Sequence, residues 1–184
     1  MFKFSKLFIP AFVLSACITL EANAQNSAFH PGEVFPEFGK VATIDTDMVI
    51  PKRVKFKVLF DADTGAPAGK LNRTLTSAAR FMNMHEEAGV SEKNMKIAAV
   101  FHGSASYDLV KDASYKDKYE GTSNTNTALI KALTDKGVRV ILCGQSAAFH
   151  GIKNDDLLPG VEMALSAMTA HALLQQEGYT LNPF

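Results

Sequence analysis

The sequence predicts an α/β fold: a three-layer sandwich in which helices cover both faces of a mainly parallel sheet of about five strands. Two observations favour this class. Short apolar and β-branched runs alternate along the chain with segments that carry apolar residues at intervals of three or four. The three helical segments each end at a glycine followed by a strand-type residue: Gly89-Val90, Gly137-Val138 and Gly178-Tyr179.

The predicted strands locate the candidate site. The strongest are the runs at residues 54–60, 96–101 and 138–142, and two weaker runs predict strands at 161–164 and 179–182. Parallel strands joined by crossover helices all end at one edge of the sheet, where ligands bind in such folds. The loops after Phe60, Phe101 and Leu142 are therefore where we expect chemistry.

Helices are expected between these strands, at residues 71–88, 124–136 and 166–177. Apolar stripes that would pack on a sheet run along the first two: Leu71, Leu75, Ala78, Ala79 and Met82, then Leu129, Ile130 and Leu133. A further helix is predicted to start at Gln145 and reach His150. For the polar segment 104–126, with its three tyrosines, the pattern leaves short helices and a flap equally open.

The amino-terminal residues predict targeting followed by an arm and one domain. Residues 1–24 have the layout of a secretory signal peptide: Lys3 and Lys6, an apolar run, and an Ala-x-Ala site ending at Ala24. Cleavage there is favoured, but Leu14-Ser15-Ala16-Cys17 resembles a lipoprotein site that would leave a lipid anchor on Cys17 instead. Both predict a periplasmic or surface location without a membrane span. Residues 25–52 are proline-rich and predict an extended arm, and 53–184 form the α/β domain.

Composition and missing motifs narrow the function classes. The chain of 184 residues carries 19 basic and 19 acidic residues, a balance that gives no reason to expect a nucleic-acid partner. Phosphate-binding loops, the serine-hydrolase elbow and a Cys-x-x-Cys motif are all missing from the sequence. Nucleotide hydrolysis, serine-hydrolase chemistry and thioredoxin chemistry are therefore disfavoured, and no cofactor is expected.

Cys143 is the leading candidate for a functional group, because it would end a buried strand and face the start of the following helix. Unpaired backbone N–H groups at that position favour a thiolate. The alternative is a buried structural cysteine that behaves as a small apolar residue.

Two further strand ends carry polar residues. His102, followed by Gly103, ends the second strong run and could take the proton of the thiol if the two strands are neighbours, or it could simply hydrogen-bond the loop backbone. Asp61 and Asp63 could orient a base or bind a cation, but turn chemistry is the favoured interpretation for both. His85, His150 and His171 lie in expected helices without the spacing of metal ligands, so no metal site is predicted.

With these residues in view, the chain resembles the DsrE/DsrF-like sulfur-transfer family, in particular its exported single-domain members. The resemblance rests on motifs in the carboxyl-terminal half: Val-Phe-His-Gly-Ser-Ala at 100–105, Cys-Gly-Gln-Ser at 143–146, Gly-Ile at 151–152, Asp-Leu-Leu-Pro-Gly-Val at 156–161 and Leu-Gln-Gln-Glu-Gly-Tyr at 174–179. It implies a Rossmann-like, DsrEFH-like domain that forms homo-oligomers, often trimers or hexamers. It also implies a cysteine that carries persulfide sulfur, and Cys143 matches that position.

The leading hypothesis is thus an exported sulfur carrier rather than a turnover enzyme, which exchanges sulfur with donor or acceptor proteins. Cys143 would hold a persulfide and His102 would tune its protonation, while backbone N–H groups of Gly144 and Gln145 stabilise the anion. The remaining candidate ligand-binding residues are Gly103, Ser146 and Asp61. Two alternatives stay open: a small-ligand-binding or structural homo-oligomer, and a redox sensor that forms a disulfide between subunits through Cys143.

Overall fold

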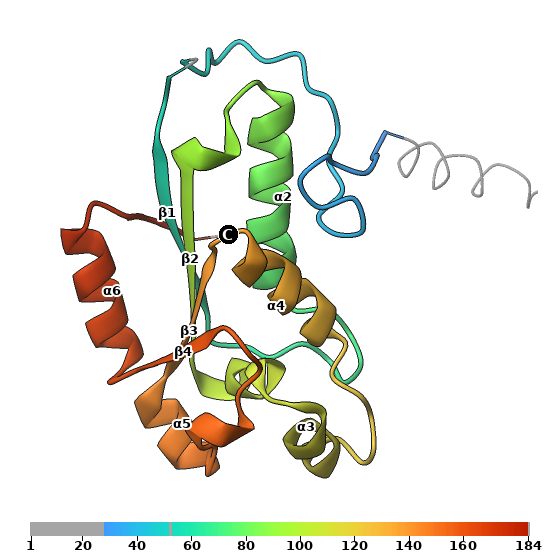
Figure 1. Ribbon diagram of the computed structural model, residues 1–184, viewed down its shortest axis with the longest axis vertical. Coiled ribbons are helices and arrows are strands. Elements are labelled where there is room, and N and C mark those ends of the chain that lie inside the picture. The colour runs from blue at the N-terminus through green and yellow to red at the C-terminus, as the bar shows by residue number, and fades with distance from the viewer. Residues whose placement is uncertain (1–27, 52, 184) are drawn as a thin grey trace, which may run out of the picture.

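A computed structural model describes residues 28–51 and 53–183 and contains one five-stranded sheet in which every paired strand runs parallel (Figure 1). The strand order is β4-β3-β2-β1-β5. The strands are β1 (Phe56–Ala62), β2 (Met95–Phe101), β3 (Arg139–Cys143), β4 (Val161–Ala164) and β5 (Thr180–Asn182). The predicted three-layer α/β fold with its parallel sheet is confirmed.

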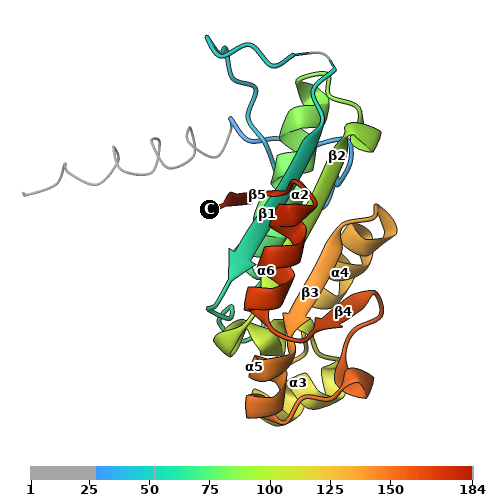
Figure 2. The same cartoon turned by 90° about the vertical axis from the view of Figure 1, so that its left-hand side faces the viewer.

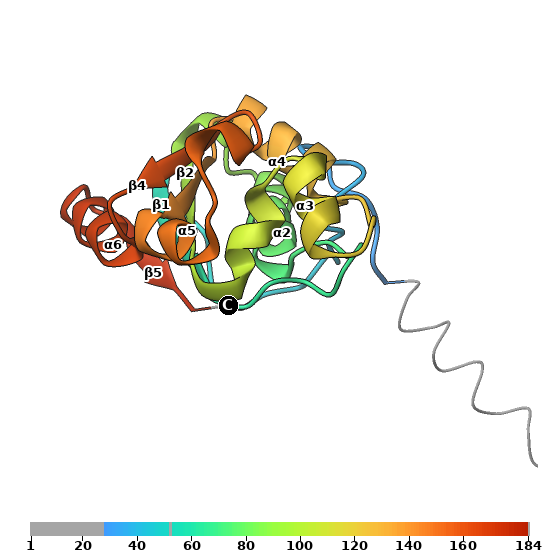
Figure 3. The same ribbon diagram turned by 90° about the horizontal axis from the view of Figure 1, so that it is seen from below.

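Helices cover the sheet on both faces (Figure 2). α2 (Arg73–Glu87) and α4 (Asn126–Asp135) lie on one face, and α6 (Ala167–Gln176) lies on the other (Figures 1 and 3). α3 (Asp112–Lys118) and α5 (Gly144–His150) lie near the carboxyl ends of the strands, together with the short 3₁₀ helix Gly103–Leu109. The loops and short helices that follow the strands therefore lie at the carboxyl edge of the sheet, where the candidate residues are found.

Two apolar cores hold the layers together. On the α2 and α4 side, the predicted helix stripes are buried against the sheet, as expected for amphipathic helices. Leu71 is the exception, because α2 begins only after Asn72, whose side-chain oxygen accepts from the backbone N–H of Thr74 and caps the helix. On the other face, Ala170 and Leu174 of α6 pack in a smaller cluster with sheet residues.

β1 extends two residues beyond its predicted end. Asp61 and Ala62 continue the pairing with β2 opposite Val100 and Phe101, and the N–H of His102 donates to Ala62 O. The turn interpretation is therefore wrong for Asp61, because the strand ladder continues through it. Asp63 does lie in the loop that follows, and its carboxylate accepts from the hydroxyl of Thr64.

The described part of the amino-terminal segment, residues 28–51, contains no helix, and its one bridge joins His30 and Val41. Asn83 of α2 holds this segment through four hydrogen bonds: its carboxamide accepts from the N–H of Phe35 and donates to the carbonyls of Phe35, Phe38 and Gly39. The expected signal peptide lies outside the described residues. Within the described ranges, no helix is long and apolar enough to cross a membrane.

The polar segment 104–126 forms short helices around a buried carboxylate. Asp108 is fully buried and accepts hydrogen bonds from Ala66 N–H and from the carboxamides of Asn72 and Asn126. Burial raises the pKa of Asp108, and these hydrogen bonds partly offset that effect. The network joins the loop after β1, the start of α2 and the start of α4.

Candidate functional site

Cys143 is the last residue of β3 and the N-cap of α5, so the strand delivers its thiol directly to a helix start. Only 6% of the residue is exposed. The backbone N–H of Ser146 donates to its Sγ at 3.5 Å. This is the arrangement that the sequence predicted for the strand and helix around Cys143.

The surroundings of Cys143 favour its thiolate. Burial by itself raises the pKa of the thiol, but hydrogen bonds to sulfur from the backbone and side chain of Ser146 and from the N–H groups of Ala167 and Gln145 outweigh it. The pKa of Cys143 therefore lies below its ordinary value. Gln145 was among the expected donors, whereas Ser146 and Ala167 were not expected in this role.

Gly103 and Ser146 join the loop after β2 to the helix after β3. The N–H of Gly103 donates to Ser146 Oγ at 3.0 Å, and His150 Nε2 lies 3.0 Å from Gly103 O. Gly103 has a positive φ of 53°, and an added Cβ would lie 2.6 Å from Asp63 O. Only glycine fits there without strain or a clash, and its backbone holds the helix that carries the donors to sulfur.

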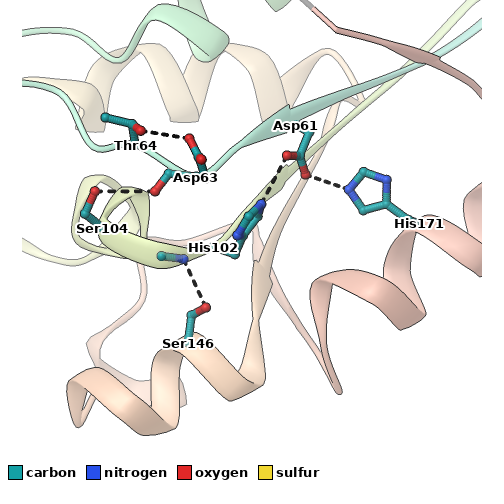
Figure 4. A network of polar contacts seen from close by, with 8 residues as sticks. Asp61, Asp63, Thr64, His102, Ser104, Ser146 and His171 are labelled. Atoms are coloured by element: carbon teal, nitrogen blue, oxygen red, sulfur yellow. Dashed lines mark hydrogen bonds and ion pairs between the residues drawn. The ribbon is translucent and has the colours of Figure 1, made fainter.

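Asp61 bridges two histidines from different layers (Figure 4). Its Oδ2 lies 3.1 Å from His102 Nε2, and its Oδ1 lies 2.6 Å from His171 Nε2 on α6. An ionised carboxylate only accepts, so each Nε2 carries the proton that it donates, and each Nδ1 is the nitrogen left to exchange a proton elsewhere. The carboxylate thus fixes the tautomer of both rings.

These groups line one open cavity of about 510 Å³ at the carboxyl edge of the sheet. Its walls are formed by Asp61, His102, Cys143, Gln145, Ser146, Ser166, Ala167, Met168, His171 and Leu181. Cys143 and His102 therefore meet at the same space, as expected if their strands were neighbours. Gly103 and Gly144 are not among the lining residues. An added Cβ on Gly144 would lie 2.5 Å from Ala164 O, so this glycine allows α5 to start against β4.

His171 is the site residue that sequence reasoning missed. Like His85 and His150, it lies in a helix without metal-type spacing, so the local sequence assigns it no role. The available signal was its place one turn into the helix that follows β4, at the same edge as the other strand ends. His85 has a structural role, because it hydrogen-bonds to Phe81 O and stacks on the Phe81 ring, and burial lowers its pKa.

Comparisons with known proteins agree with this fold. The model of the DsrE/DsrF-like family matches residues 57–183. A solved protein of unknown function, MTH1491 from Methanobacterium thermoautotrophicum, superposes with a TM-score of 0.53 at 21% identity over 71% of this chain and 100% of its own. The ychN protein from E. coli superposes with a TM-score of 0.50 at 19% identity over 70% and 100%. No curated protein matches the sequence.

Proposed function

The chain belongs to the DsrE/DsrF-like family, which is associated with sulfur relay, and we propose that it carries sulfane sulfur as a persulfide on Cys143. The observation that carries this proposal is a nearly buried Cys143 thiol on the wall of an open cavity with the N–H of Ser146 directed at its sulfur, an arrangement in which hydrogen bonds lower the pKa of the thiol. A structural cysteine needs neither an opening nor donors aimed at its sulfur. A sulfur acceptor needs both, because the thiolate is the nucleophile.

The transfer step exchanges one sulfur–sulfur bond for another. His102 takes the proton of Cys143, and the thiolate attacks the outer sulfur of a donor persulfide, R–S–SH. A Cys143–sulfur bond forms as the donor sulfur–sulfur bond breaks, and the electron pair leaves on R–S⁻, which receives the proton back from His102. The products are the Cys143 persulfide and R–SH, with no net oxidation.

Each group in the cavity has a place in this step. Asp61 holds His102 with Nδ1 available to exchange the proton, and it stabilises the imidazolium that forms. The N–H groups of Ser146, Ala167 and Gln145 stabilise the negative charge on Cys143 before attack and on the persulfide anion afterwards. An acceptor thiolate unloads the protein by the same attack on the outer sulfur.

We also propose that the protein works outside the cytoplasm as a homo-oligomer. The amino-terminal pattern through Ala24 supports export, with lipidation at Cys17 as the alternative. Large apolar side chains that do not line the cavity are exposed, among them Phe149 at 85% and Val49 at 85%, which supports association. The mass of the amino-terminus after secretion tests the first claim, and light scattering tests the second.

The experiment that tests the carrier function is persulfide loading followed by intact mass. The purified mature chain, which begins after Ala24 and so lacks Cys17, is exposed to a small persulfide, freed of excess donor, and measured beside C143S. We expect the wild type to gain the mass of one sulfur atom and C143S to gain none. Equal gain in both proteins, or none in the wild type, would contradict the proposal.

A further inference from the structure

The titratable side chains Asp61, His102 and His171 that line the cavity already hydrogen-bond to one another. Its lining includes one carboxylate, Asp61, whose two oxygens each accept from a histidine. Among the described residues, those that line this cavity include no lysine or arginine. Sites that recognise anionic substrates normally supply such a cation, often arginine as a bidentate partner. An anionic substrate would instead meet the carboxylate and the Cys143 thiolate.

The polar donors of the cavity are also engaged. The N–H groups of Ser146 and Ala167 point to Cys143 sulfur, so the starts of both α5 and α6 serve the thiolate. The Gln145 carboxamide donates to Leu165 O, and Ser166 Oγ accepts from the N–H of Thr169 and lies 3.0 Å from Thr169 Oγ1. Few donors remain that could replace the water around a charged substrate.

The remaining wall is apolar. Ala167 and Met168 from the first turn of α6 and Leu181 from β5 complete the lining. Met168 is 79% exposed, so its thioether is free to cover a ligand, and a flexible, polarizable side chain adapts to apolar groups of varied shape. Cavities of this size with apolar walls and a few polar groups are typical of small-molecule sites.

We propose that the sulfur donor at this cavity is a small persulfide whose carbon group is apolar and uncharged, in preference to a donor whose carbon group is anionic. This inference rests on the proposed carrier function and names its substrate class. The apolar carbon group lies against Met168 and Leu181, which directs the sulfur–sulfur bond to Cys143. The transfer step itself is the one given above, with the apolar thiol R–SH as the leaving product.

The test compares benzyl persulfide with glutathione persulfide, which carries net negative charge on its peptide. Loading rates of Cys143 are measured by intact mass, and each rate is divided by the rate of the same donor with free cysteine, which removes intrinsic reactivity. We expect a preference of roughly ten-fold or more for benzyl persulfide, the scale on which apolar pockets discriminate small groups.

Met168→Lys places a cation at the rim and should reduce or reverse this preference, while Met168→Leu should keep it. Leu173→Lys is the matched control, because Leu173 is an exposed residue of the same helix outside this cavity. It should leave the preference unchanged, and all variants should unfold cooperatively like the wild type. Equal normalised rates in the wild type, faster loading by glutathione persulfide, or no change of preference in Met168→Lys would each overturn the inference while leaving the carrier function intact. If neither donor loads Cys143, the carrier function fails, and the substrate class fails with it.

Discussion

Ser146→Ala is the most informative single change to the thiol. It removes a hydroxyl that hydrogen-bonds to Cys143 and accepts from Gly103 N–H, while the backbone N–H of residue 146 stays in place. A hydrogen bond to a charged group contributes about 1.5–3 kcal/mol, and each pKa unit corresponds to about 1.4 kcal/mol. The variant should therefore raise the pKa of Cys143 and lower the fraction of thiolate at a pH below that pKa by roughly ten-fold or more.

The assay is the rate of alkylation by iodoacetamide as a function of pH. We expect the midpoint of Ser146→Ala to move to higher pH, since the thiolate loses a donor. Ser104→Ala is the matched control: this hydroxyl accepts from Gly65 N–H and donates to Asp63 O in the neighbouring loop. It should titrate like the wild type. Identical midpoints for all three proteins would refute the view that Ser146 stabilises the thiolate.

Three further changes test other parts of the structure. Asp61→Asn should slow persulfide loading of Cys143 roughly ten-fold or more, with little change in thermal unfolding. The substitution removes the negative charge and replaces one of the two acceptor oxygens with an NH₂ donor, so the two histidines can no longer both donate to residue 61. Asp108→Ala should lower the free energy of unfolding in urea by about 3 kcal/mol or more, because it leaves buried donors unpaired. Gly137→Ala should lower the free energy of unfolding by about 1 kcal/mol, and Gly103→Ala should lower it further. Both glycines have a positive φ, but only a Cβ at Gly103 would meet a neighbouring atom. Urea unfolding of the two variants measures the difference.

The raised pKa of Asp108 makes the free energy of unfolding depend on pH. Its folded-state pKa lies above its unfolded value of about 3.9, so the folded state holds the proton more tightly. Stability from this group is present below the unfolded pKa and is lost as pH rises through the folded pKa. Urea unfolding between pH 3 and neutral pH should show this loss in the wild type relative to Asp108→Ala, which lacks the group. A difference between the two proteins that does not vary with pH would contradict the assignment.

Local sequence patterns predicted most of the fold. Apolar runs located all five strands and apolar spacing located the three long helices, because each element buries a face that its own sequence marks. The meeting of Cys143 and His102 also followed, since parallel strands end at one edge. The ends of the strands were predicted less accurately. β1 continues through Asp61 because this residue pairs with β2, which is distant in the sequence.

What the sequence did not reveal depends on long-range placement. His171 reaches Asp61 because α6 crosses the second face of the sheet on its way from β4 to β5, and no local spacing marks that path. The same holds for Ala167, whose N–H reaches Cys143 from the start of that helix. The hydrogen bonds of Asp108 join loops and helix starts that are distant in sequence. The polar composition of residues 104–126 therefore did not indicate that Asp108 is buried.

Persulfide on Cys143 inside the producing cells is tested by the mass of the peptide that carries this residue, taken from protein isolated without reductant and alkylated at once. We expect a population in which Cys143 carries one extra sulfur atom, which a reducing thiol removes. A peptide found only as the unmodified thiol or as an oxygen-oxidised cysteine, even when sulfane sulfur is supplied to the cells, would show that Cys143 is not a sulfur carrier.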